Sequence, residues 1–178
     1  MGHFYFVRHG ETYWNVENKI CGKTDIGLTE NGRKQAEETG RLILQEKLHI
    51  DMILTSPLSR ASDTARIISD ITGIPVRTES RLIEQNFGRF ESTPRDGKEF
   101  HEAKKNMADR YGDGESMLMT AHRIYSVLDE ITADPETVYL IAAHNGLARI
   151  VESYFRSMSN GEFSAFGLKN CEIRKYPF

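Results

Sequence analysis

The sequence predicts an α/β layer fold with a mostly parallel sheet. Short apolar runs alternate along the 178 residues with longer stretches of helical period. Strands joined by helices are usually parallel, and their carboxyl ends meet at one edge of the sheet, where functional groups gather. Three of the predicted strands are followed within a few residues by arginine or histidine. One pattern therefore predicts both the fold class and the place of the chemistry.

The first half of the chain supplies two strands and two helices. Residues 4–7 (FYFV) predict a buried strand, and residues 29–47 place small or apolar side chains at helical spacing, with Thr29 as the N-cap. Residues 52–55 predict the next strand. Ser56 and Pro57 then offer an N-cap followed by proline at the first helical position, which predicts a helix to about residue 72 that Gly73 ends.

The second half continues the alternation. Residues 75–77 predict a short strand, and 138–142 predict a strongly apolar one. Helices are expected over 116–131 and 147–158, and 171–176 should close the sheet. Between them, 89–114 is polar with weak periodicity, and we expect a lid-like insertion there. Because we find no repeat, low-complexity segment or linker, a single domain over 1–178 is expected.

Composition excludes several classes of partner. A net charge of -3 offers no cationic field to nucleic acid or to a membrane surface. Cys21 and Cys171 lie far apart without CxxC spacing, which argues against a zinc site and a disulfide framework. No apolar run approaches the roughly 20 residues that span a bilayer, and the first residues resemble neither a signal peptide nor a myristoylation site. We expect a cytoplasmic protein.

The strand ends carry a distinctive set of side chains. Arg8 and His9 follow the first strand, Arg60 lies shortly after the second, and His144 follows the strand at 138–142. A surface ion pair or a core histidine would explain any one of them alone. Four cationic or hydrogen-bond-donating groups at one edge of the sheet, in a chain of net negative charge, instead predict a pocket for a phosphate or phosphoryl group.

These residues belong to an ordered set of motifs. RHGET at 8–12 is followed by Trp14-Asn15, LTENG at 28–32 and Gln35-Ala36; then come SPLSRA at 56–61, Leu82-Ile83-Glu84 with Phe87-Gly88, Gly114-Glu115-Ser116, and AHNG at 143–146 with Arg149. In this order, over essentially the whole chain, the motifs resemble those of the histidine phosphatase, or phosphoglycerate-mutase-like, superfamily.

The resemblance implies a three-layer α/β/α sandwich in which His9 is transiently phosphorylated. A neutral imidazole is a competent nucleophile, so His9 can accept the phosphoryl group and divide one displacement into two. The charge that develops in the transition state needs fixed donors, a role that suits Arg8, Arg60 and His144. Neither a metal ion nor another cofactor is required.

The resemblance also implies a proton donor for the leaving alkoxide, at Glu84. A carboxylic acid close to a phosphate dianion loses part of its preference for ionisation, which suits a general acid. The same carboxylate would then activate water against the phosphorylated histidine. Glu11 and Glu91 are the alternatives for this role.

Four further positions complete the predicted site. Asn15 matches a family residue that contacts phosphate, although it could equally cap a short helical turn. Cys21 and Gly22 occupy a region where relatives often carry a polar side chain before glycine, so the contact there could be only a backbone amide. Asn145 stands where many relatives have glycine, and we assign it to substrate binding.

The leading hypothesis is a metal-independent phosphatase that hydrolyses a small phosphorylated metabolite. A cofactor-dependent phosphoglycerate mutase is the alternative, but mutases of this superfamily carry a longer insertion than the 60 positions (144 minus 84) that separate Glu84 from His144. A phosphatase of phosphohistidine proteins and a non-catalytic phosphate-binding module remain further alternatives. Arg95 and Lys98 would suit a second acidic group on the substrate, although we prefer a solvated helix there. Oligomeric state and pathway are left open.

Overall fold

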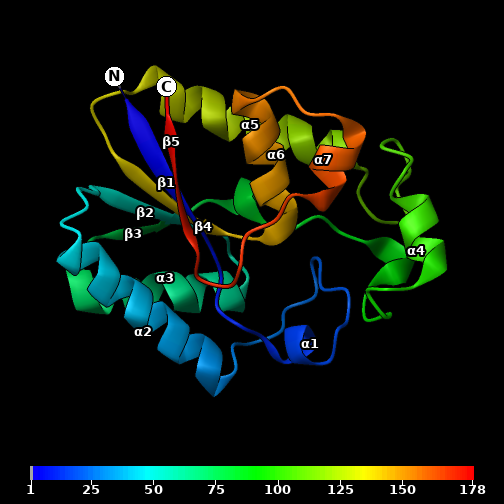
Figure 1. Ribbon diagram of the computed structural model, residues 1–178, viewed down its shortest axis with the longest axis horizontal. Coiled ribbons are helices and arrows are strands. Elements are labelled where there is room, and N and C mark those ends of the chain that lie inside the picture. The colour runs from blue at the N-terminus through cyan, green and yellow to red at the C-terminus, as the bar shows by residue number, and fades with distance from the viewer. Residues whose placement is uncertain (1) are drawn as a thin grey trace.

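A five-stranded sheet forms the centre of the protein, whose computed structural model describes residues 2–178 (Figure 1). The strands are β1 (His3–Arg8), β2 (Met52–Thr55), β3 (Val76–Thr78), β4 (Tyr139–Ala143) and β5 (Ile173–Pro177), in the order β3-β2-β4-β1-β5. All neighbours pair in parallel except β5, which runs antiparallel to β1 at the edge. The predicted, mostly parallel sheet is therefore confirmed.

Helices cover both faces of this sheet (Figure 1). The helices α2 (Glu30–Gln45) and α3 (Ser59–Thr72) pack together on one face, whereas α5 (Met117–Ala133) and α6 (Asn145–Phe155) pack on the other. Each helix turns an apolar side toward the strands and a polar side toward solvent, as the helical spacing of the sequence requires. The three-layer α/β/α arrangement is confirmed.

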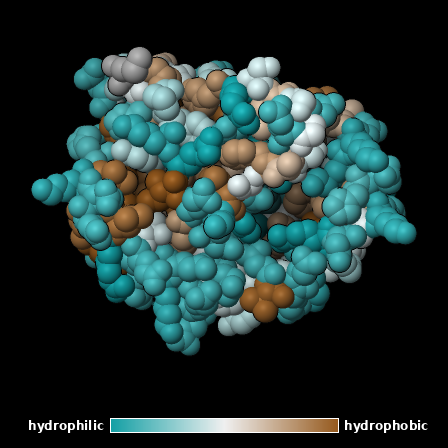
Figure 2. All heavy atoms as spheres, viewed as in Figure 1, coloured by the Kyte–Doolittle hydropathy of each residue, from teal (hydrophilic) through white to brown (hydrophobic). Residues whose placement is uncertain are grey.

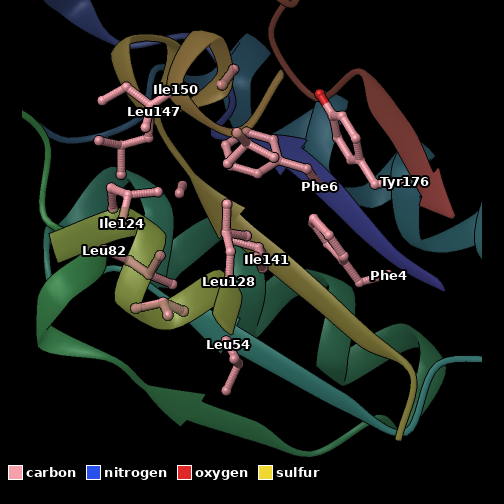
Figure 3. Close-up of a cluster of buried hydrophobic side chains, with 14 of the residues drawn as sticks. Phe4, Phe6, Leu54, Leu82, Ile124, Leu128, Ile141, Leu147, Ile150 and Tyr176 are labelled. Carbon is pink, nitrogen blue, oxygen red and sulfur yellow. The ribbon is translucent and has the colours of Figure 1, made fainter. Parts of the chain in front are cut away.

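The alternation of side chains along β1 divides the apolar core between the two faces. Phe4 and Phe6 point into the cluster beneath α5 and α6, which Figure 3 shows together with Leu128 and Ile141. Tyr5 belongs to the cluster beneath α2 and α3. Because both faces are covered, β1 is apolar along its whole buried length rather than alternating with polar residues. In Figure 2 much of the visible surface is hydrophilic, and the most hydrophobic visible residues gather mainly at the left of the view.

Shorter elements lie outside the three layers. They are α1 (Tyr13–Val16), η1 (Ser80–Leu82), η2 (Gly88–Phe90), α4 (Lys98–Ala103) and α7 (Asn160–Ala165). The segment 89–114, which looked polar in the sequence, buries a small apolar cluster of its own from Phe90, Phe100 and Tyr111, together with Ile20. Within residues 2–178, no helix has both the length and the apolar character needed to cross a membrane.

Several predicted helix boundaries agree with the structure. Thr29 caps α2 by accepting a hydrogen bond from the Gly32 amide, and Ser116 caps α5 in the same way through the Met119 amide. Gly73 ends α3 in the left-handed conformation, with φ of 75°. Glycine adopts this conformation without the steric cost that a Cβ brings.

Two local predictions were wrong, and one of the two roles left open for Asn15 is excluded. The α3 helix begins at Ser59 rather than at Pro57, because the Ser56 hydroxyl contacts His144 and the amide of Leu58 instead of capping the helix. Thr12 rather than Asn15 caps α1, and Asn15 occupies the third position of the resulting capping box. The helix expected to end at 158 ends at Phe155, and α7 follows as a separate helix.

A close approach of two glycines joins β1 to α2. A Cβ at Gly10 would overlap the carbonyl oxygen of Gly32, and a Cβ at Gly32 would overlap the backbone of Glu11. The first turn of α2 therefore packs directly against the loop that follows β1. This contact fixes the direction in which the chain leaves the strand at His9.

We predict that Gly32→Ala destabilises the protein by about 1–3 kcal/mol, because the added methyl group forces the loop at 10–11 away from α2. Gly27→Ala is the matched control, since nothing lies within 4 Å of a Cβ there. Urea unfolding of both variants measures the difference. Equal stability of the two variants would show that the loop tolerates the displacement.

Candidate active site

Two histidines meet at the carboxyl ends of β1 and β4. The parallel register pairs Arg8 with Ala143, so the residues that follow, His9 and His144, leave neighbouring strands side by side. The His9 amide donates to the Ala143 carbonyl at 2.9 Å, and the two imidazole rings lie 5.4 Å apart between centroids. Both side chains are buried. The sheet topology therefore brings together two side chains 135 positions apart (144 minus 9).

The hydrogen bond of His9 defines its tautomer. Its Nδ1 lies 2.7 Å from the carbonyl oxygen of Gly10, which can only accept. Nδ1 must therefore carry the proton, and Nε2 of the neutral ring keeps its lone pair. The ring is held by its own backbone in the orientation of a nucleophile.

The ring of His144 is held from the opposite side. Its Nε2 lies 2.7 Å from the hydroxyl of Ser56, and that hydroxyl also accepts from the Leu58 amide. When the hydroxyl proton points to Nε2, Nδ1 carries the ring proton, and Nδ1 is buried without a partner. In that tautomer His144 presents one unused donor beside His9.

Burial and positive charge keep both rings neutral. The pKa of His9 is held well below its usual range, first by burial and then by the charges of Arg60 and Arg8. The pKa of His144 is likewise held well below its usual range, first by burial and then by Arg60. Neutral imidazole is the form that can act as a nucleophile.

The two arginines of the motifs make hydrogen bonds to backbone carbonyls rather than to carboxylates. Arg8 donates to Leu168 O at 2.7 Å, and burial lowers its pKa to about 10. Arg60 donates to Thr24 O at 2.9 Å and to Gly22 O at 2.6 Å. The Nε atom of each guanidinium is buried without a partner. Both side chains therefore keep their full positive charge for a bound anion.

Glu84 is placed beside the histidines by the loop after η1. Its carboxylate is buried and accepts from the amides of Gln85, at 2.9 Å, and Gly146, at 3.0 Å. A Cβ at Gly146 would overlap this carboxylate, so the glycine two residues after His144 leaves room for it. Glu84 lines the same cavity as His9.

The two alternative carboxylates are engaged elsewhere. Glu11 accepts from the hydroxyl of Thr29 at 2.8 Å and does not line the cavity. Glu91 accepts from the amides of Gly22, Lys23 and Phe87 and from the hydroxyl of Thr24. Glu91 is thus engaged in holding these loops together and does not line the cavity.

The remaining predicted residues differ in their positions. Asn15 and Cys21 line the cavity, and burial raises the pKa of the Cys21 thiol to about 11. Asn145 also lines it, while its side-chain oxygen accepts from the Leu168 amide at 2.8 Å. Gly22 does not line the cavity, but its carbonyl holds Arg60.

The cavity has about 840 Å³ of empty space, its open mouth included. Of the nine predicted site residues, six line it: Arg8, His9, Asn15, Cys21, Glu84 and Asn145. The other three do not line the cavity. His144 lies beside His9, and Arg60 binds the carbonyl of Gly22, next to the cavity residue Cys21. The predicted residues therefore converge on one cavity.

Sequence reasoning missed two groups of residues at this site. The turn after α7 contributes Asn170, whose side-chain amide donates to His9 O at 2.9 Å and to the side chain of Asn15 at 3.3 Å. Lys104 and Arg149 also line the cavity. Arg149 was noted with the AHNG motif but not assigned to the site, although it follows Asn145 by one helical turn on α6. Nothing in the sequence singles out Lys104 among its charged neighbours.

Within residues 2–178, no three His, Cys, Asp or Glu side chains are arranged so that they could hold a metal ion. The polar groups that surround His9 are donors and cations, which suit an anion. An arrangement of a nucleophilic imidazole, two arginines and a buried carboxylate can perform phosphoryl transfer.

Comparisons with known proteins agree with this chemistry. A protein of Erwinia tasmaniensis named Probable phosphoglycerate mutase GpmB is 34% identical over 96% of this chain and 82% of its own length. The protein of the same name from Yersinia pestis is 34% identical over 81% of this chain and 69% of its own length.

Two solved structures show the same fold. A mycobacterial glucosyl-3-phosphoglycerate phosphatase has a TM-score of 0.84 at 24% identity, covering 98% of this chain and 89% of its own. The product of an open reading frame of Mycobacterium tuberculosis has a TM-score of 0.81 at 26% identity, covering 99% and 91%. The model of the histidine phosphatase superfamily (branch 1) matches residues 4–178, so the chain belongs to that superfamily.

Proposed function

We propose that the protein is a phosphatase that hydrolyses a small phosphomonoester through a phosphohistidine intermediate on His9. The observation that carries this proposal is the 2.7 Å hydrogen bond from Nδ1 of His9 to the Gly10 carbonyl, which leaves the Nε2 lone pair free. Burial beside two arginines keeps the ring neutral. A neutral, oriented imidazole next to fixed cations is what attack on a phosphate ester requires.

The reaction has two displacements. In the first, Nε2 of His9 forms a bond to phosphorus while the bond to the leaving alcohol oxygen breaks, and Glu84 donates a proton to that oxygen. In the second, Glu84 takes a proton from water, the water oxygen attacks phosphorus, and the P–N bond breaks to release inorganic phosphate. Glu84 therefore ends each cycle in the form in which it began.

Arg8, Arg60 and His144 stabilise the charge on the transferring group. Each carries a buried nitrogen without a partner, namely Nε of each arginine and Nδ1 of His144. A buried donor that has lost water without gaining a partner costs free energy, so the site is set up for an anion that supplies acceptors. Donors that are already oriented act without reorganisation during the reaction.

Two features favour hydrolysis over transfer back to the substrate. The chain between Glu84 and His144 is short compared with that of mutases, and much of it, 89–114, contributes to the cavity wall instead of to a larger cover.

The 34% identical relatives named phosphoglycerate mutase favour the second candidate, a mutase. Both candidates use the same first displacement and differ only in whether water reaches the phosphohistidine.

We predict that the protein releases inorganic phosphate from 3-phosphoglycerate or phenyl phosphate without isomerising 3-phosphoglycerate. Phosphorus NMR of the reaction mixture distinguishes free phosphate from 2-phosphoglycerate. The rate should be unchanged by a chelator, because protein donors supply the positive charge. Rapid isomerisation with little free phosphate would favour the mutase, and a requirement for a divalent metal would contradict the mechanism.

We predict that Glu84→Gln converts steady turnover of 4-nitrophenyl phosphate into a burst of one nitrophenolate per site. This leaving group needs no proton, so the first displacement survives, whereas attack by water loses its base and slows by about 10²–10⁴-fold. Stopped-flow absorbance measures the burst. His9→Gln is the matched control and should show neither burst nor turnover; a burst in that variant would exclude His9 as the nucleophile.

We predict that stability falls as pH is lowered from 7.5 to 5.5. The unfolded chain protonates both imidazoles near their usual pKa, whereas the native protein keeps them neutral, so the unfolded state binds more protons at low pH. The loss is at most about 1.4 kcal/mol per pH unit for each imidazole.

Urea unfolding at the two pH values tests this linkage. His144→Gln should lose less stability than the wild type over this range, because it has one buried imidazole fewer. His122→Gln, at an exposed position on α5, should lose as much as the wild type. An identical loss in the wild type and in His144→Gln would show that the buried ring is already protonated.

A further inference from the structure

The cavity carries more positive charge than a single phosphoryl group needs. Besides Arg8, its lining includes Arg95, Lys104 and Arg149. Within residues 2–178, ion pairs with Asp or Glu are formed by many surface cations but by none of these four. Lys105, the neighbour of Lys104, pairs with Glu102 at 2.6 Å on the exposed side of the same segment. Within residues 2–178, none of the four cavity cations therefore has a carboxylate partner in an ion pair.

The three additional cations line the same cavity and influence one another electrostatically. Burial, followed by the charges of Arg149 and Arg95, lowers the pKa of Lys104 to about 8. Arg95 donates to Lys19 O at 2.9 Å, and Arg149 has a buried Nε without a partner. Like charges held together in a partly buried wall repel one another, and an anion placed between them would relieve that repulsion.

Arg8 does not belong to the same end of the cavity as Lys104. The charges of Arg95 and Arg149 lower the pKa of both Arg8 and Lys104, but the charge of Arg8 does not affect the pKa of Lys104. Arg95 and Arg149 therefore extend the positive wall of the cavity from the phosphoryl site at Arg8 and His9 to Lys104. A positive wall of this extent can bind a second anionic group beside the phosphoryl group.

The wall that accompanies the cations is apolar and aromatic. It includes Phe87, Phe100, Tyr111, Phe163, Met107 and Met117. Phe87 meets Phe100 edge to face at 5.6 Å, and Lys104 lies 5.2 Å from the centre of the Phe100 ring. Such walls bind flat or apolar surfaces, and they exclude the water that would weaken a charge pair. The body of the substrate should therefore be apolar or aromatic.

We propose that the substrate carries a second anionic group, joined to the phosphate by an apolar or aromatic body, and that Lys104, Arg95 and Arg149 bind that second group. The proposal rests on the phosphatase function above and names its substrate class. Arg95 is half-buried in the turn before α4 and lines the cavity, so the solvated helix expected there does not describe this residue. Lys98 is exposed and does not line the cavity.

Matched synthetic esters test the proposal. Aryl phosphates with a carboxylate at the 3 or 4 position of the ring are compared with the corresponding carboxamides, which have a similar shape and no charge. We expect the wild type to show a kcat/KM for at least one carboxylate roughly tenfold or more above that for its carboxamide, the effect of a charged hydrogen bond.

The variants Arg95→Gln and Lys104→Gln, alone and combined, locate the effect. The carboxylate-to-carboxamide ratio should fall in each single variant, through KM more than kcat, and should approach one in the double variant. Lys105→Gln, the adjacent exposed lysine, is the matched control and should keep the wild-type ratio. Thermal melting confirms that each variant is folded.

The outcomes separate this proposal from the proposed function. If the wild type hydrolyses carboxylates and carboxamides equally well at both positions, the second anion site is excluded while the phosphatase function stands. If Lys105→Gln lowers the ratio as much as Lys104→Gln, a diffuse surface charge is responsible and the proposed site is excluded. If the wild type releases phosphate from none of the esters, the phosphatase function itself fails.

Discussion

The hydrogen bonding of Arg8 and Arg60 to backbone carbonyls rather than to carboxylates, beside neutral imidazoles, is the constraint on which the architecture of the site depends. A guanidinium removed from water needs acceptors, and a carboxylate counter-ion would cancel the charge that an incoming anion needs. Backbone carbonyls satisfy both requirements, because they accept hydrogen bonds while bearing no net charge. Arg8 uses the carbonyl of Leu168, and Arg60 uses those of Gly22 and Thr24. The loops around the cavity are therefore placed where these carbonyls are required.

The loop that serves Arg60 is itself held by Glu91. Its carboxylate gathers the amides of Gly22 and Lys23 from that loop and the amide of Phe87 from the neighbouring one. The carbonyls of Gly22 and Thr24 therefore accept hydrogen bonds from the Arg60 guanidinium, while the amides of Gly22 and Lys23 donate to the Glu91 carboxylate. This short loop separates the two opposite charges, so they do not form an ion pair. This arrangement joins the segment 89–114, through its own small apolar cluster, to the edge of the phosphoryl site.

The sequence predicted the sheet, both helical layers and the convergence of the motif residues. Hydrophobic periodicity identifies the strands and helices locally, and parallel strands bring the residues at their carboxyl ends close together. His9 and His144 are the clearest example, since each simply follows a buried strand. Predictions failed where a distant partner decides the outcome. The sequence around Ser56 is typical of a helix cap, but in the folded protein its hydroxyl forms a hydrogen bond with His144. Asn170 reaches the His9 carbonyl only because β5 pairs with β1, which the local sequence does not reveal. Lys104 belongs to the same class, because only the folded wall distinguishes it from Lys105.

The contacts between the beginning and the end of the chain have a consequence for biosynthesis. Arg8 and His9 are held by Leu168 and Asn170, about 160 residues later in the sequence. At roughly 5–20 residues per second, a ribosome needs about 10–30 s to make the intervening chain. During that time β1 lacks its antiparallel neighbour, and Arg8 at the end of β1 lacks its carbonyl acceptor. A nascent chain therefore cannot assemble this catalytic centre step by step, and activity should arise only at the last stage of folding.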